Sequence, residues 1–123
     1  MVTSVTSLGR NGVYDWLIQR LSAVVIGVYA IVLIGYLALN PGLDYEGWKA
    51  CMTSVPAQIA NTLVIFSVVG HAWVGLWTIT TDYLTRTQFG NAATGLRLAL
   101  QALIVLALLV LLLWGLLIVW GGA

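Results

Sequence analysis

Three long apolar stretches alternate with short polar segments along the chain. The first covers about residues 16–39 and ends at the Asn-Pro-Gly turn 40–42, which stops a helix. The second covers about 57–80, with Pro56 suited to a helix start, and the third covers about 96–120. Each is long enough to cross roughly 30 Å of bilayer hydrocarbon, where an isolated segment can satisfy its backbone only as a helix. We therefore predict an all-α membrane protein with three transmembrane helices.

The composition supports a membrane-embedded chain with a single domain, residues 1–123. The chain is 61% hydrophobic and 7% charged, with a mean hydropathy of +1.01, whereas soluble domains have about 25% charged residues. A net charge of +1 argues against nucleic-acid binding. The apolar core 21–39 exceeds the ~7–15 residues of a signal peptide, so we expect a retained span in a bacterial chain. The single cysteine, Cys51, is expected in a loop, half-buried.

The basic residues near the span ends predict the orientation. Arg10 and Arg20 precede or open the first span, and Arg86 and Arg97 lie between the second and third spans. All four fall on one side of the membrane, against Lys49 alone on the other. Since basic residues concentrate in cytoplasmic loops, we expect a cytoplasmic N-terminus and a periplasmic C-terminus.

One face of the second span carries small and polar residues. Ser67, His71, Gly75, Thr78 and Asp82 fall within about 80° of each other around a helix. An ionisable group inside the bilayer faces protein, a cofactor or a cavity. Three interpretations are open for His71: helix packing through a bond to a neighbouring carbonyl, a proton path, or ligation of haem iron with Gly75 removing bulk beside the porphyrin.

Arg20 and the histidine count bear on the haem interpretation. Arg20 could pair with a haem propionate, or extend to the interface and set the topology. Because the chain has one histidine, a second axial side chain would come from another polypeptide. The three helices would then be half of a larger bundle. On their own, Tyr83 and Asp82 indicate an interface anchor and a solvated acid.

Several strings together resemble one family: GRNGVYD at 9–15, Arg20, HAWVGLW at 71–77, TDY at 81–83 and VWG at 119–121. The chain resembles the hydrophobic membrane anchor of bacterial succinate dehydrogenase (complex II), a cytochrome b protein. The resemblance implies a heterodimer with a second three-helix anchor protein. The two proteins would form a six-helix bundle that holds haem b in the inner membrane. It also implies docking of the iron–sulfur and flavoprotein subunits on the cytoplasmic face, and reduction of ubiquinone near that face.

Carried over by position, the resemblance implies four site residues. His71 would be the axial haem ligand and Arg20 a propionate partner. Tyr83 would donate a hydrogen bond to a quinone carbonyl oxygen, with Asp82 beside it. Two features depart from the family: Tyr14, where some relatives have histidine, and the longer, more polar stretch 84–95.

Two alternative functions remain open at this point. A fumarate reductase would run the same machinery in the opposite direction, which the sequence does not determine. A small transporter or structural bundle would use His71 and Asp82 as proton or ion groups. A transport path usually needs several polar groups at mid-membrane, and the third span has none beyond Gln101.

Overall fold

The computed structural model describes residues 12–121, and all its regular elements are helical. They are α1 (Gly12–Leu39), α2 (Tyr45–Met52), α3 (Val55–Tyr83), α4 (Arg86–Phe89), the 3₁₀ helix η1 (Gly90–Ala92) and α5 (Ala93–Trp120). No β-strand occurs within this range. The predicted all-α class is confirmed. Arg10 and part of the string 9–15 lie outside the described residues.

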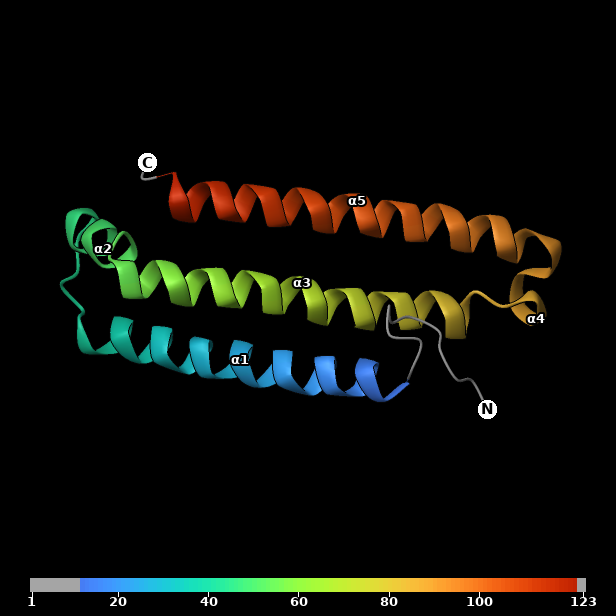
Figure 1. Ribbon diagram of the computed structural model, residues 1–123, viewed down its shortest axis with the longest axis horizontal. Coiled ribbons are helices and arrows are strands. Elements are labelled where there is room, and N and C mark those ends of the chain that lie inside the picture. Colours follow the sequence, from blue (N-terminus) through green and yellow to red (C-terminus); the bar gives the residue numbers. More distant parts are fainter. Residues whose placement is uncertain (1–11, 122–123) are drawn as a thin grey trace.

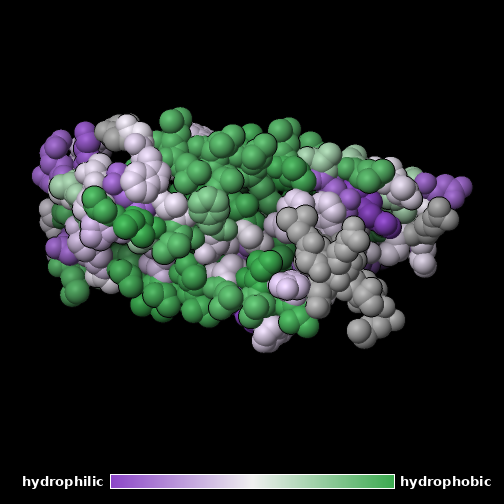
Figure 2. All heavy atoms as spheres, viewed as in Figure 1, coloured by the Kyte–Doolittle hydropathy of each residue, from purple (hydrophilic) through white to green (hydrophobic). Residues whose placement is uncertain are grey.

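The three long helices lie side by side, with α3 in the middle. α3 packs against α1 on one side and against α5 on the other. The short helix α2 lies at one end of this layer, and α4 lies at the opposite end (Figure 1). Three helices in the described chain are long and apolar enough to cross a membrane, and Figure 2 shows apolar residues over the middle of the layer with polar residues toward both ends. The chain is a multi-pass membrane protein.

The long helices extend beyond the apolar stretches seen in the sequence. They have 28 or 29 residues, or about 42 Å of length at a rise of 1.5 Å per residue. Bilayer hydrocarbon is only ~30 Å thick, so their end turns reach the polar interface. The apolar stretches in the sequence mark only the part of each helix that lies in hydrocarbon. The backbone hydrogen bonds of the helix continue beyond that part. Pro56 occupies the first turn of α3, as expected.

The helix α2 has no counterpart among the predicted elements. Its first turn is capped by Asp44, whose Oδ1 accepts a hydrogen bond from the Gly47 backbone nitrogen at 2.9 Å. Glu46 adds a favourable negative charge in the same turn. The element has only eight residues, too few for a clear periodic signal. Cys51 lies half-buried on this helix, so the expectation that it lies in a loop is wrong.

Polar side chains join the helices across the layer. Gln101 on α5 donates to the Thr80 hydroxyl on α3 at 2.9 Å, and the Trp120 indole donates to the Thr62 hydroxyl at 2.8 Å. Helices in a bilayer associate through close packing and such hydrogen bonds, because lipid is as apolar as the side chains that it would replace. Many large apolar side chains of α1, α3 and α5 accordingly stay exposed in the single chain.

Candidate functional site

His71 lies on α3, half-buried, and its imidazole faces α1. Its Nδ1 is 3.1 Å from the hydroxyl oxygen of Ser22. Its other ring nitrogen, Nε2, is 3.5 Å from the amide nitrogen of Gln19. Ser22 is 6% exposed. The histidine is therefore held between two polar side chains from consecutive turns of α1.

The protons available to these groups favour one histidine tautomer. The Ser22 hydroxyl lies 3.1 Å from the Gln19 carbonyl oxygen, to which it can only donate, and a hydroxyl that donates there acts as an acceptor toward His71. The Gln19 amide nitrogen can only donate, so the Nε2 that it faces must be an acceptor. Together the two contacts favour the tautomer with the imidazole proton on Nδ1. In that tautomer the Nε2 lone pair faces the Gln19 amide through a long contact of 3.5 Å.

This arrangement fits an iron ligand at Nε2. A metal-binding histidine uses an unprotonated nitrogen and donates its other N–H to a nearby acceptor. Within the described residues, the hydrogen-bond contact at Nε2 is the long one to Gln19, whose Oε1 is buried there without a hydrogen-bond partner. Little bonding would be lost if this amide moved aside. The His71 ring contacts a hydroxyl and a side-chain amide. The helix-packing interpretation expects a bond to a carbonyl on a neighbouring helix.

Residues 12–121 contain no group of three or more histidine, cysteine or acidic side chains that could hold a metal ion. Iron bound at His71 would need its other ligands from a porphyrin and from a second polypeptide.

An open groove of ≈ 350 Å³ lies between α1 and α3, and its lining includes Gln19, which contacts His71, but not His71 itself. Arg20 lines it, with its guanidinium carbon 5.7 Å from the centre of the Trp16 ring. Gly75 forms part of the facing wall, and a Cβ there would be 3.6 Å from the Gln19 amide nitrogen. That is an ordinary contact, so packing within this chain does not require glycine. The groove brings the predicted Arg20 and Gly75 together, and Gly75 lies one turn along α3 from His71.

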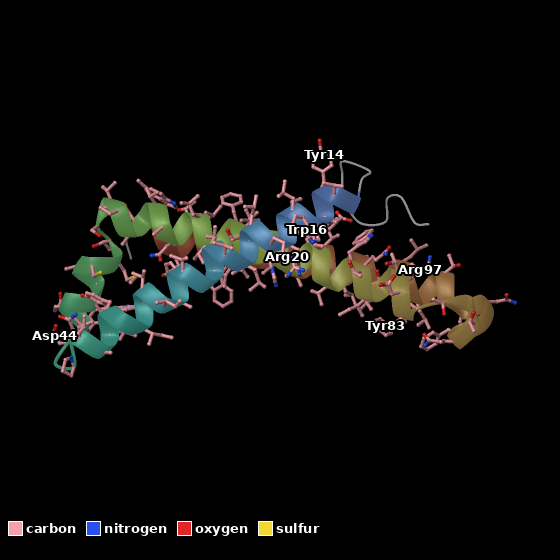
Figure 3. The ribbon with its side chains drawn as sticks, turned by 90° about the horizontal axis from the view of Figure 1, so that it is seen from below. Tyr14, Trp16, Arg20, Asp44, Tyr83 and Arg97 are labelled. Atoms are coloured by element: carbon pink, nitrogen blue, oxygen red, sulfur yellow. The ribbon has the colours of Figure 1, made fainter. Side chains whose placement is uncertain are left out.

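Tyr83 and Asp82 lie apart from this groove. Tyr83 is the last residue of α3 and is 62% exposed. It lies 12 residues after His71, which corresponds to about 18 Å along a continuous helix. Asp82 is also exposed. Figure 3 shows Tyr83 and Arg97 nearer the α4 end than Arg20, with Tyr14 near the start of α1. The predicted residues thus lie at two locations, His71 with Arg20 between α1 and α3, and Asp82 with Tyr83 at the end of α3.

The end of α3 that carries Tyr83 is tied to α5. Thr80 is completely buried and accepts the hydrogen bond from Gln101. The Arg97 guanidinium donates to the carbonyl oxygen of Leu84, the residue that follows Tyr83, at 2.9 Å. That carbonyl lies where a helix has no internal donor left, and a positive charge there is favourable. The two ties hold Asp82 and Tyr83 relative to α5.

Sequence reasoning missed Ser22, Gln19, Thr80 and Arg97 as contributors to the two locations. A signal existed for the first two, because polar residues three positions apart share one helix face and flank Arg20. Thr78, placed on the predicted polar face, donates within its own helix to Val74 at 2.7 Å.

A third polar cluster lies toward the α2 end. The Tyr29 hydroxyl donates to the Asn61 side chain, and the Asn61 amide contacts the Met52 sulfur at 3.4 Å. These contacts join α1, α3 and α2. Nothing in the pattern of apolar stretches indicated them.

Comparison with known proteins gives a relative of matching length. No family model matches the chain. The chain is 34% identical over 116 residues to a protein of Coxiella burnetii (strain RSA 493 / Nine Mile phase I), described as "Succinate dehydrogenase hydrophobic membrane anchor subunit". The alignment covers 94% of this chain and 95% of the relative.

Proposed function

This chain belongs to the succinate dehydrogenase hydrophobic membrane anchor subunits, and on that premise we propose that it binds haem b and contributes to a ubiquinone site. As a member of this family it is part of an enzyme complex. In the proposal the complex lies in the bacterial inner membrane and oxidises succinate. The observation that carries the haem assignment is Nε2 of His71, which among the described residues has only the long contact to Gln19, a side chain that lines the groove together with Arg20.

His71 and Arg20 would hold the haem from this chain. Nε2 of His71 would bind the iron, while the Ser22 hydroxyl oxygen would accept a hydrogen bond from Nδ1–H and hold the ring plane. Arg20, on the wall of the groove, would pair with a propionate. A second anchor protein would supply the other axial ligand. When bound, haem supplies a one-electron carrier within the membrane.

Tyr83 and Asp82 would serve the quinone. Reduction of a quinone to a quinol takes up two electrons and two protons, so the site needs a hydrogen-bond donor at a carbonyl oxygen and a route for protons. The exposed Tyr83 hydroxyl can donate to that oxygen without a permanent charge. Asp82 is exposed beside it and can exchange protons with water.

The location of Tyr83 supports docking of the soluble subunits at the α4 end. The positive-inside rule predicts this end to be cytoplasmic, where the iron–sulfur and flavoprotein subunits would bind. The exposed apolar side chains of the three long helices leave ample surface for the second anchor protein and for lipid. Membership in the family favours this redox role over the transporter interpretation.

Replacement of His71 tests the proposal. In the purified complex, His71→Ala should remove or strongly weaken the absorption bands of reduced b-type haem, because the iron loses an axial ligand. Leu63→Ala, at an exposed position two turns earlier on α3, is the matched control and should keep the bands. Full haem occupancy with an unchanged spectrum in His71→Ala would contradict the ligand assignment.

A further inference from the structure

The contacts on the two nitrogens of His71 are unequal, and the difference assigns separate roles to Ser22 and Gln19. Ser22 is buried and lies at normal hydrogen-bond distance from Nδ1. Gln19 lies at the outer limit of a hydrogen bond from Nε2, with its Oε1 buried and unpartnered among the described residues. One contact is well formed, whereas the other leaves half of an amide unsatisfied.

We infer that Ser22 is a positioning residue for the His71 ligand, and that Gln19 is a displaceable occupant of the space at Nε2. The inference rests on the proposed haem ligation by His71. Ser22 sets which ring nitrogen is free and the direction in which it points, and Gln19 moves away when iron binds.

The short relay through Ser22 gives it this role. Its hydroxyl donates to the Gln19 carbonyl oxygen one turn earlier on α1, and this donation makes the oxygen a better acceptor for the Nδ1 proton. The Gln19 carbonyl oxygen belongs to the α1 backbone, and the bond to it holds the Ser22 hydroxyl in place. The orientation of the imidazole on α3 is consequently fixed by the docking of α1, and rotation of the ring would break the bond to Ser22.

An acceptor on Nδ1–H also tunes the ligand electronically. It increases the basicity of the imidazole, which favours the more positively charged, oxidised iron. Loss of the Ser22 hydroxyl should therefore shift the haem midpoint potential in the positive direction. Removal of such an outer partner typically weakens metal binding about 10- to 100-fold. We therefore expect the affinity for haem to decrease about 10- to 100-fold.

The tautomer can be tested without haem. His71 is the only histidine, so the full chain with ¹⁵N-labelled histidine in lipid nanodiscs gives a single pair of imidazole nitrogen signals. We expect a protonated Nδ1 and an unprotonated Nε2, and a loss of this preference in Ser22→Val. A protonated Nε2 in the unaltered chain, or the same tautomer preference in Ser22→Val, would overturn the inference.

The haem-loaded complex provides the second test, with three α1 variants. Ser22→Thr keeps a hydroxyl, whereas Ser22→Val has nearly the same shape as that threonine without one, so the pair separates hydrogen bonding from packing. Ser22→Val should lose haem about 10- to 100-fold more readily and raise the midpoint potential, and Ser22→Thr should restore both. Gln19→Leu should retain haem at least as well as the unaltered complex.

The outcomes separate this inference from the proposed function. Equal haem retention and potential in Ser22→Val and Ser22→Thr would overturn the role of Ser22. A loss of haem in Gln19→Leu as large as in Ser22→Val would overturn the different roles of the two residues. Intact haem binding in His71→Ala would contradict the proposed ligation of haem by His71, on which this inference rests. The nitrogen signals of the chain without haem would still test the contact between Ser22 and His71.

Discussion

At the scale of single residues, Tyr83 carries a testable part of the quinone proposal. Tyr83→Phe removes only the phenol hydroxyl and leaves the exposed ring at the end of α3. We expect quinone reduction to slow by roughly 2- to 10-fold, the equivalent of a ~0.5–1.5 kcal/mol hydrogen bond. Succinate oxidation coupled to an artificial dye should remain unchanged, since the dye does not need the membrane site.

Tyr45→Phe is the matched control for this assay. Tyr45 is another exposed tyrosine, 66% accessible, on α2 at the opposite end of the layer. Its replacement should change neither activity. Equal quinone turnover in Tyr83→Phe and the unaltered complex would exclude a hydrogen bond from Tyr83 to the reacting quinone.

The sequence predicted single chemical groups better than their contacts. His71 stood out because an ionisable side chain inside a bilayer needs a partner, and Arg20 because of its charge. The contacts of Ser22 and Gln19 with His71 depend on the rotation of α1 about its own axis. A span of apolar residues does not determine that rotation, because many faces of such a helix are equally apolar.

At the scale of elements, the tie between α3 and α5 leads to an asymmetric prediction. The Thr80 hydroxyl donates to the Trp77 carbonyl at 2.6 Å and accepts from Gln101 at 2.9 Å. Gln101→Leu leaves Thr80 with one bond, whereas Thr80→Val leaves the amide of Gln101 buried and unpaired. Thr80→Val should therefore destabilise the complex by about 1–3 kcal/mol, and Gln101→Leu by the ~0.6 kcal/mol typical of such bonds in membranes.

Thermal unfolding of the detergent-solubilised complex measures these effects. The double variant Thr80→Val with Gln101→Leu completes a double-mutant cycle. The double variant should resemble Gln101→Leu, because no stranded amide remains. Equal destabilisation by the two single variants would show that the hydrogen bond does not join the helices in the way that its geometry indicates.

The stretch 84–95 shows where sequence patterns stop predicting elements. The pattern marks it as polar and unusually long, but its two short helices, α4 and η1, are below the length at which periodicity is visible. Gly90 has a φ of 62°, in the left-handed region that favours glycine. The hydrogen bond from the Arg97 guanidinium to the Leu84 carbonyl oxygen joins the start of this stretch to α5. That closure depends on a contact between two helices, which local sequence does not encode.

At the scale of the whole molecule, the layer has two chemically different ends, and the proposed quinone and docking sites require a particular one to face the cytoplasm. Tyr83 lies at the α4 end, while Asp44 and α2 lie at the other (Figures 1 and 3). Of the basic residues with described side chains, Arg97 lies toward the α4 end and Lys49 lies on α2 at the other, while Arg20 lies near the middle of the layer. The positive-inside rule predicts the α4 end to be cytoplasmic.

Accessibility of single cysteines tests this orientation. In a Cys51→Ser background, which has no other cysteine, Glu46→Cys places an exposed thiol on α2 and Asn91→Cys an exposed thiol at the opposite end. A reagent that cannot cross the inner membrane, applied to cells with a permeable outer membrane, should label Glu46→Cys. Asn91→Cys should react in inverted membrane vesicles stripped of the soluble subunits, because docking would otherwise cover it. The reverse pattern would place Tyr83 on the periplasmic side, away from any cytoplasmic source of electrons, and the docking proposal would fail even if His71 binds haem.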